Sequence, residues 1–193
     1  MQSICVFCGS SQGSDPAYTE AARSLGRTLA EANIRLIFGG GHVGLMGVLS
    51  NAALEAGGDV VGIIPKFLVE RELAHAGLTD LRIVGSMHER KAMMSGLSNG
   101  FITLPGGTGT LEEFFEVLTW AQLGEHGKPC GLLNVAGYYD PLLAVFDHMV
   151  ERGFLSDSNR SLVLVECEPE RLLERFEAYD PPKRPKWINE AET

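Results

Sequence analysis

Long apolar runs and positive charge are both scarce in this sequence. A membrane-spanning helix needs about 20 consecutive apolar residues, but no stretch reaches that length, and no basic leader precedes the first apolar run, residues 4–8. We therefore expect a cytoplasmic protein with no membrane partner.

The 25 Asp and Glu residues outnumber the 16 Lys and Arg residues, for a net charge of −9. Because nucleic-acid binding depends on clustered cations, this balance argues against a nucleic-acid partner but leaves room for a small anion in a local pocket.

Metal-binding and linker patterns are also missing. The five histidines and four cysteines show no metal-site spacing, so we expect no metal ion. No stretch rich in proline, serine or charge divides the chain, which predicts one domain, residues 1–180, followed by a proline-rich, flexible tail, residues 181–193.

The thiols of Cys5 and Cys8 should point to opposite faces of one strand. We interpret all the cysteines as reduced core thiols rather than metal or redox sites: Cys5, Cys8, Cys130 and Cys167.

Strand and helix patterns alternate along the chain, and the strand patterns are continuously apolar. Such strands are typical of a parallel sheet that helices cover on both faces, so we expect an α/β fold with a Rossmann-like, doubly wound parallel sheet. Asp15 and Asp140 should cap the helices that Pro16 and Pro141 open. The expected strands are residues 4–8, 35–38, 60–64, 81–84, 101–104, 130–135 and 162–165, and the expected helices are 16–32, 45–56, a segment after residue 86, 110–123, 140–150 and 169–179; residues 66–77 fit neither pattern.

The most informative stretch is the glycine-rich loop that follows residues 101–104. It has the sequence PGGTGT at residues 105–110 and precedes a helical pattern. Three glycines within four residues let the backbone approach a ligand closely, and the next helix directs its free N–H groups toward the loop. This arrangement predicts an anion site. Ligands of parallel sheets bind at the carboxyl ends of the strands, where the loops that begin at Gly9 and Gly39 also fall.

Three carboxylates, Glu112, Glu113 and Glu116, follow this loop and lie off the apolar stripe of the helix. These carboxylates would repel a bound phosphate, so we expect that one of them takes part in a reaction or that cations lie nearby. A structural interpretation is open as well, because Thr110 and Glu113 fit a capping box in which the carboxylate bonds back to the N–H of the capping residue. The residues alone leave both interpretations in place.

A second capping box is predicted at Ser86 and Glu89, and two cations, Arg90 and Lys91, fall in the first turns of that helix. Cations at this position oppose the helix dipole. A bound anion or a facing carboxylate would explain them, and so would exposure to solvent.

Gly39, Gly41 and Gly44 match the G-x-G-x-x-G pattern of dinucleotide-binding loops, which makes a nicotinamide-dependent enzyme one candidate. The pattern follows the second strand rather than the first, and Lys66 stands where a ribose-binding acid would be expected. Asp59 lies at the opposite end of that strand. The glycines therefore favour a mononucleotide over a dinucleotide.

Three motifs resemble those of the LOG (lonely guy) family of phosphoribohydrolases: GGGHVGLMG at residues 39–47, MHERK at 87–91 and PGGTGTLEE at 105–113. The resemblance covers about residues 2–180. It implies a Rossmann-like enzyme that hydrolyses the N-glycosidic bond of cytokinin riboside 5′-monophosphates, with Arg90 and Glu113 as its catalytic residues. It also implies a homodimer, with which the long apolar helices at 110–123 and 140–150 are compatible.

Members of this family have often been labelled lysine decarboxylases, an activity that needs pyridoxal phosphate on a lysine. No motif for that cofactor surrounds Lys66, Lys91 or Lys128, so we expect no cofactor. The expected partner is a small molecule, an adenosine 5′-monophosphate with or without an N6 substituent. The expected substrate-binding residues belong to the three motifs and the first glycine loop: Gly9, Ser10, Gly40, Gly41, Gly44, Met46, Met87, Lys91, Gly106, Gly107, Thr108, Gly109, Thr110 and Glu112.

A non-catalytic nucleotide-binding or carrier module of the same fold is the alternative. Breaking a glycosidic bond builds positive charge at the anomeric carbon, which a carboxylate such as Glu113 can stabilise. A pure phosphate binder gains nothing from carboxylates beside its loop, so their presence favours the enzyme. Whether Arg90 contacts substrate or keeps Glu113 ionised stays open at this point. His42 and His88 have no assigned role.

Overall fold

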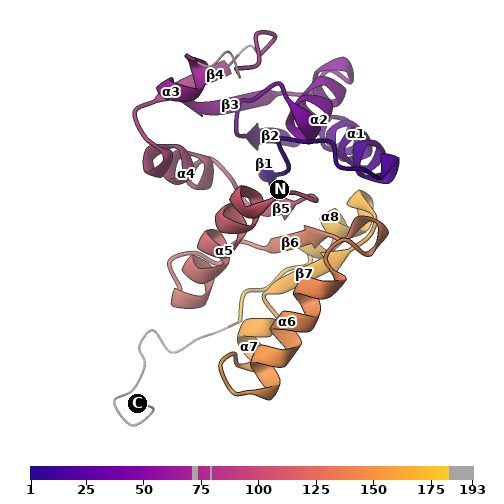
Figure 1. Ribbon diagram of the computed structural model, residues 1–193, viewed down its shortest axis with the longest axis vertical. Helices are drawn as coiled ribbons and strands as arrows, with labels where there is room; N and C mark the ends of the chain where they lie inside the picture. The colour runs from indigo at the N-terminus through magenta and orange to yellow at the C-terminus, as the bar shows by residue number, and fades with distance from the viewer. Residues whose placement is uncertain (71–73, 79, 183–193) are drawn as a thin grey trace.

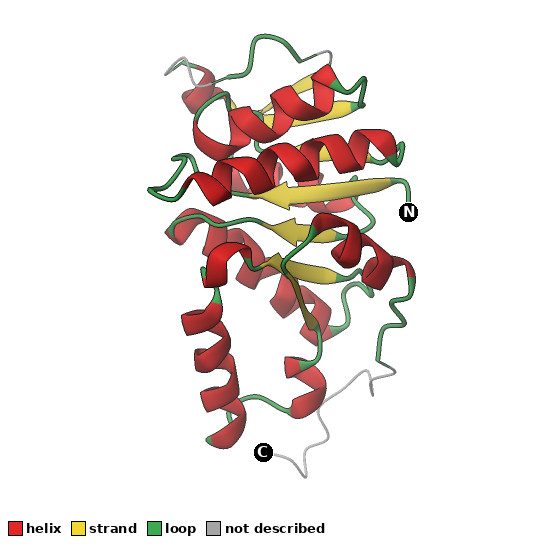
Figure 2. Ribbon diagram, turned by 90° about the vertical axis from the view of Figure 1, so that its right-hand side faces the viewer, coloured by secondary structure: helices red, strands yellow, loops and turns green. Residues whose placement is uncertain are grey.

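A single parallel sheet organises the protein. The structure is a computed structural model that describes residues 1–70, 74–78 and 80–182, so the expected flexible tail lies outside the described residues from 183 onward. The strands are in the order β4-β3-β2-β1-β5-β6-β7, and every pairing is parallel. Figure 2 shows strands of this sheet among the helices that cover it. The predicted α/β fold is confirmed. The strands are β1 Ser3–Phe7, β2 Arg35–Phe38, β3 Val60–Pro65, β4 Asp80–Val84, β5 Phe101–Thr103, β6 Cys130–Leu133 and β7 Val163–Glu166.

Helices cover both faces of the sheet, and each face has its own apolar core (Figure 1). One face packs against α1 Pro16–Glu31, α2 Gly44–Glu55 and α8 Pro169–Glu177. The other packs against α4 Met87–Gly96, α5 Thr108–Leu123 and α6 Asp140–Glu151. Short helical segments complete the described chain: α3 Lys66–Val69, η1 Val135–Gly137 and α7 Asp157–Arg160. Within the described ranges, no helix combines the length and apolar character needed to span a membrane.

The chain reverses its direction of travel across the sheet between β1 and β5. Strands β1 to β4 run outward in sequence order, after which β5 returns to pair with β1. The loops that follow these two strands therefore diverge to opposite faces of the sheet, and a crevice forms at their carboxyl ends. The Gly9 N–H donates to Pro105 O at 3.0 Å, and Gly9 O accepts from the Leu45 N–H at 3.0 Å. These bonds tie together the loop after β1, the loop after β5 and the start of α2.

Two of the four predicted helix caps are confirmed. Asp15 accepts a hydrogen bond from the Ala17 N–H at 2.9 Å at the start of α1. Ser86 Oγ accepts from the Glu89 N–H at 3.1 Å at the start of α4. The Glu89 carboxylate reaches one residue beyond the cap and accepts from the Gly85 N–H at 2.7 Å.

The other two predicted caps are wrong. Helix α5 begins three residues earlier than the capping box requires, with Gly107 as its extended N-cap, so that Thr110 is buried within the first turn and Glu113 does not serve a cap. Asp140 is the first residue inside α6 rather than its cap. Asn134 makes the side-chain hydrogen bonds at the start of α6. Its amide group donates to Asp140 Oδ1, and its Oδ1 accepts from the Tyr139 N–H, both at 2.7 Å.

The cysteines largely follow the prediction. Cys5 and Cys8 are buried in the cores on opposite faces of the sheet, and Cys130 is also buried. Burial raises the pKa of each of these three thiols, in the case of Cys130 to about 12, so they stay protonated at neutral pH. Cys167 is exposed in the turn between β7 and α8, so the prediction of a core thiol is wrong there.

Candidate active site

A cleft of about 430 Å³ lies at the carboxyl ends of β1, β2, β3 and β5. Helices α4 and α5 supply its charged side chains, and the segments after β1, β2 and β5 supply its glycines and small polar residues. One part of the wall is apolar and the rest is polar. The lining consists of Cys8, Ser10, Gly39, Gly41, Val43, Met46, Ile64, Leu68, Met87, Arg90, Gly107, Thr108, Gly109, Thr110, Glu112 and Glu113.

Most residues expected at the site share this cleft. The structure brings together Ser10, Gly41, Met46, Met87, Arg90, Gly107, Thr108, Gly109, Thr110, Glu112 and Glu113. The expected residues that do not line it are Gly9, Gly40, Gly44, Lys91 and Gly106. The lining residues that sequence reasoning missed are Cys8, Gly39, Val43, Ile64 and Leu68. Each of these missed residues lies on or just after β1, β2 or β3. Because ligands of parallel sheets bind at the carboxyl ends of the strands, that position in the sequence could have predicted them as lining residues.

Glycines outside the lining shape the loops around it. A Cβ on Gly44 would lie 2.2 Å from the carbonyl carbon of Ser10, and Gly44 has a φ of +60°, so only glycine lets α2 begin against the loop after β1. A Cβ on Gly106 would lie 2.2 Å from Thr110 Oγ1. Gly9 and Gly106 also border an adjoining hollow of about 270 Å³ that shares Ser10 and Gly107 with the cleft.

The N-terminus of α5 opens directly into the cleft. Gly107 caps the helix without a side-chain hydrogen bond, and Leu111 makes the first bond of the helical ladder, from its N–H to Gly107 O at 3.1 Å. The N–H groups of Thr108, Gly109 and Thr110 precede that ladder and carry the positive end of the helix dipole. A 16-residue helix with this start provides a place for an anion.

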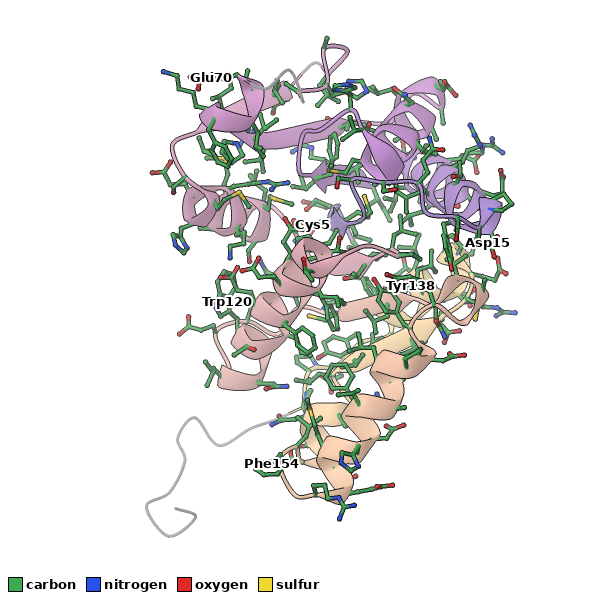
Figure 3. The ribbon with its side chains drawn as sticks, in the orientation of Figure 1. Cys5, Asp15, Glu70, Trp120, Tyr138 and Phe154 are labelled. Atoms are coloured by element: carbon green, nitrogen blue, oxygen red, sulfur yellow. The ribbon has the colours of Figure 1, made fainter. Side chains whose placement is uncertain are left out.

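Two tyrosines after β6 donate hydrogen bonds to the segment that follows β5 and contains the glycine-rich loop. Tyr138 donates from its hydroxyl to Gly106 O at 2.6 Å, and the buried Tyr139 donates to Leu104 O at 2.7 Å. Figure 3 labels Tyr138, which belongs to the segment that joins β6 to α6. Nothing in the local sequence indicates these contacts, because each spans more than 30 residues.

Arg90 and Glu113 form the charged floor of the cleft. The closest approach is 3.6 Å, from Arg90 Nη1 to Glu113 Oε1, and the two side chains are only 10% and 12% exposed. Backbone carbonyls at the ends of two strands hold the guanidinium: Arg90 Nε donates to Ile63 O at 3.2 Å and Nη2 donates to Gly39 O at 3.3 Å. A Cβ on Gly39 would lie 1.8 Å from Arg90 Nη2, so any larger residue there would displace the guanidinium. Helix α4 thus places Arg90 across the ends of β2 and β3.

Burial dominates the electrostatics of Glu113. It raises the pKa of this carboxyl from an ordinary 4.5 to about 6, since the charged form loses its hydration. Arg90 and Lys91 favour the charged form and act against this rise, whereas Glu112 and Glu116 add to it. Sequence reasoning placed Glu113 off the packing face of α5, but the structure shows it largely buried beneath α4.

The two cations of α4 face carboxylates, which confirms one of the two explanations considered for them. Lys91 Nζ bonds Glu112 Oε1 at 2.5 Å and Glu116 Oε1 at 3.1 Å. Lys91 therefore reaches the cleft only through Glu112, which lines it, and is not itself a lining residue.

Comparisons with known proteins identify relatives over most of this chain. The family model described as "Possible lysine decarboxylase" matches residues 46–176. A probable cytokinin riboside 5′-monophosphate phosphoribohydrolase, LOGL6 of Oryza sativa subsp. japonica, is 52% identical over 92% of this chain and 71% of its own length. A cytokinin riboside 5′-monophosphate phosphoribohydrolase of Rhodococcoides fascians is 52% identical over 85% of this chain and 83% of its own.

Solved structures show the fold in more distant proteins. The molybdenum cofactor binding protein of Rippkaea orientalis superposes with a TM-score of 0.70 at 23% identity, over 92% of this chain and 97% of that one. At this identity the likeness establishes the fold alone. The matched family model and the relatives at 52% identity establish more: the chain belongs to the LOG family of cytokinin riboside 5′-monophosphate phosphoribohydrolases, within the group described as possible lysine decarboxylases.

Proposed function

We propose that this protein hydrolyses the N-glycosidic bond of adenosine 5′-monophosphates, including those with an apolar N6 substituent, and releases the free base and ribose 5-phosphate. The observation that carries the proposal is the buried Arg90–Glu113 pair, 3.6 Å apart, in a cleft that also receives the N-terminus of α5. The names of relatives with 52% identity support the same activity.

Glu113 is the proposed catalytic carboxylate. When the bond between the anomeric carbon and the base breaks, its electron pair leaves with the base and positive charge develops on the sugar. A carboxylate beside the sugar stabilises that charge and orients the water whose oxygen bonds to the anomeric carbon, while a proton from water ends on the base. The buried position of Glu113 strengthens this electrostatic effect, because little solvent screens it.

Arg90 acts mainly on Glu113 in this proposal. Its Nε and Nη2 are engaged with strand carbonyls, and Nη1 donates to Met87 Sδ at 3.7 Å and faces Glu113. These contacts leave the guanidinium little freedom to follow a substrate. A fixed positive charge at this position offsets part of the cost of burial and keeps Glu113 ionised near neutral pH.

The phosphate is proposed to bind at the start of α5. Backbone N–H groups at Thr108, Gly109 and Thr110, together with the threonine hydroxyls, offer donors at the positive end of the helix. Ser10 lines the same cleft from the loop after β1. Anchoring the phosphate there would position the sugar over Glu113, because the carboxylate is on the second turn of the same helix.

The base is proposed to occupy the apolar part of the cleft. Strand β3, the segments after β2 and β3, and the start of α4 contribute apolar side chains, which suit a purine ring and a hydrocarbon substituent on N6. These side chains are Val43, Met46, Ile64, Leu68 and Met87.

We also infer a homodimer in the cytoplasm. Large apolar side chains at the end of α5, on α6 and just beyond α6 are exposed: Leu123 at 68%, Val145 at 48% and Phe154 at 88%. Figure 3 labels Phe154 beyond the end of α6. A second copy would cover such surface. The unpaired thiols Cys5, Cys8 and Cys130 support a reducing compartment.

The direct test follows base release by chromatography with an N6-substituted adenosine 5′-monophosphate and with AMP. We expect equal amounts of free base and ribose 5-phosphate, and no release by Glu113→Gln. The carrier alternative predicts binding without turnover. Tight nucleotide binding by a folded wild-type protein that releases no base from either substrate would contradict the proposed function.

A further inference from the structure

Lys91 joins α4 to α5 at a buried position. The two helices lie side by side on one face of the sheet (Figure 1), and Lys91 Nζ contacts two α5 carboxylates, Glu112 Oε1 at 2.5 Å and Glu116 Oε1 at 3.1 Å. The Lys91 side chain is only 10% exposed. Burial lowers the pKa of Lys91, but the hydrogen bonds to Glu112 and Glu116 outweigh this effect and raise the pKa above its ordinary value. The ammonium group is therefore charged at any pH at which the enzyme is assayed.

These two carboxylates are the neighbours of Glu113 on its own helix. Glu112 precedes it, and Glu116 lies three residues later, within one helical turn. The charged groups that shift the pKa of Glu113 are Arg90 and Lys91 on α4 and Glu112 and Glu116 on α5. The thiols of Cys5, within β1, and Cys8, just after it, also interact with Glu113. Burial keeps the two thiols neutral, so two cations face three carboxylates and no positive charge is in excess.

We propose that Lys91 is a positioning residue for the reaction: it neutralises Glu112 and Glu116 and holds α5 against α4, so that Glu113 stays beside Arg90 as a carboxylate. The motif predicted a substrate contact for Lys91; in the structure Lys91 does not line the cleft itself but pairs with Glu112, which does, and with Glu116. The inference rests on the proposed function, because it assumes that Glu113 acts in its ionised form.

A charge role and a packing role for Lys91 predict different pH dependences. If Lys91 only packs α4 on α5, its loss should lower kcat/KM by the same factor at every pH. If Lys91 neutralises charge, its loss leaves two uncompensated carboxylates near Glu113. The acid limb of the kcat/KM profile, which we expect near the Glu113 pKa of about 6, should then move to higher pH.

The experiment compares Lys91→Met with Lys91→Arg, which keeps the charge, and with the triple variant Lys91→Met, Glu112→Gln, Glu116→Gln, which removes the whole cluster. We expect Lys91→Met to move the acid limb up by about half a pH unit, the size expected for like charges within one helical turn. Its kcat/KM relative to wild type should then be about threefold lower at pH 5 than at pH 8.5. Lys91→Arg and the triple variant should keep the acid limb at or below its wild-type position.

Lys128 provides the matched control. Its ammonium group is also partly buried and bonds the other end of α4, at Ser95 O, at 2.8 Å, without facing a carboxylate. Lys128→Met should leave the acid limb in place even where it lowers stability. An unmoved limb in Lys91→Met, or a limb shifted to higher pH in the triple variant, would overturn the assignment.

A second readout separates this inference from the proposed function. Side-chain ¹³C NMR, with the Glu113 signal assigned from Glu113→Gln, reports the titration of the carboxyl without turnover. A higher Glu113 pKa in Lys91→Met supports the role of Lys91 even for a protein that releases no base, an outcome that would overturn only the proposed function. Turnover with an unchanged Glu113 titration in Lys91→Met would overturn only the role of Lys91.

Discussion

Replacing Glu113 by glutamine should stabilise this protein at alkaline pH while it abolishes turnover. Folding raises the pKa of Glu113 from 4.5 to about 6. Each pKa unit corresponds to about 1.36 kcal/mol, so the ionised carboxylate costs the folded state about 2 kcal/mol. Glutamine has a similar shape to the protonated acid and avoids this cost, while its amide cannot supply the negative charge that the reaction needs.

The sign of the effect depends on pH. Below about pH 4.5 Glu113 is protonated in the folded and unfolded states alike, so glutamine and glutamate should give the same unfolding free energy. As the pH rises through about 6, the folded state must also ionise, and wild type loses stability that the variant keeps. The gain of Glu113→Gln should therefore be complete by pH 8.

Urea denaturation followed by tryptophan fluorescence at pH 5, 6.5 and 8 measures this difference. At pH 8 we expect the unfolding free energy of Glu113→Gln to exceed that of wild type by about 2 kcal/mol, equivalent to a rise in Tm of roughly 4–8 °C for a chain of this size. Glu55→Gln, an exposed glutamate of α2, is the chemical control and should change stability by less than about 0.5 kcal/mol at each pH. Equal or lower stability of Glu113→Gln at pH 8 would refute the conclusion that a desolvated carboxylate lies in the cleft.

Four further predictions concern the site and the assembly. Gly39→Ala should lower kcat/KM about 100-fold, because the added methyl group displaces Arg90. Gly96→Ala, at an open position on α4, is the control and should leave kcat/KM unchanged. Comparable kcat/KM values for the two variants would contradict the Arg90 geometry. AMP should be cleaved at least about 100-fold more efficiently than adenosine, because two lost charge-assisted contacts contribute on the order of 3 kcal/mol or more; equal base release would remove the phosphate site from α5. Chelation with EDTA should leave turnover unchanged, because no cluster of metal-ligating side chains occurs among the described residues; loss of activity that a single metal ion restores would show otherwise. Light scattering at micromolar concentration should give a dimer mass, and Phe154→Glu should reduce it; a wild-type monomer would count against the homodimer.

The sequence by itself determined the class of fold and the location of the crevice. Strand and helix periodicities are local properties of side-chain spacing, so the alternating order, the continuously apolar strands and the helix that starts at Pro16 could be read without a structure. Glycine-rich loops after successive strands indicated the sheet edge at which the cleft lies. The motifs at residues 39–47, 87–91 and 105–113 were enough to indicate the family.

Tertiary structure decided how the charged groups meet. The capping box at Thr110 and Glu113 is locally plausible, but α5 starts at Thr108, which leaves Glu113 buried against Arg90. A pKa near 6 follows from that burial and has no counterpart in the sequence pattern.

Three further contacts were also decided by packing. Lys91, which the motif places at the substrate site, pairs with two carboxylates of α5. Tyr138 bonds the glycine-rich loop from a segment 32 residues away. Gly39 is small because the Arg90 guanidinium lies against it. Each contact joins residues that are distant in sequence, and only the packing of helices onto the ends of the strands sets their distance, burial and charge balance.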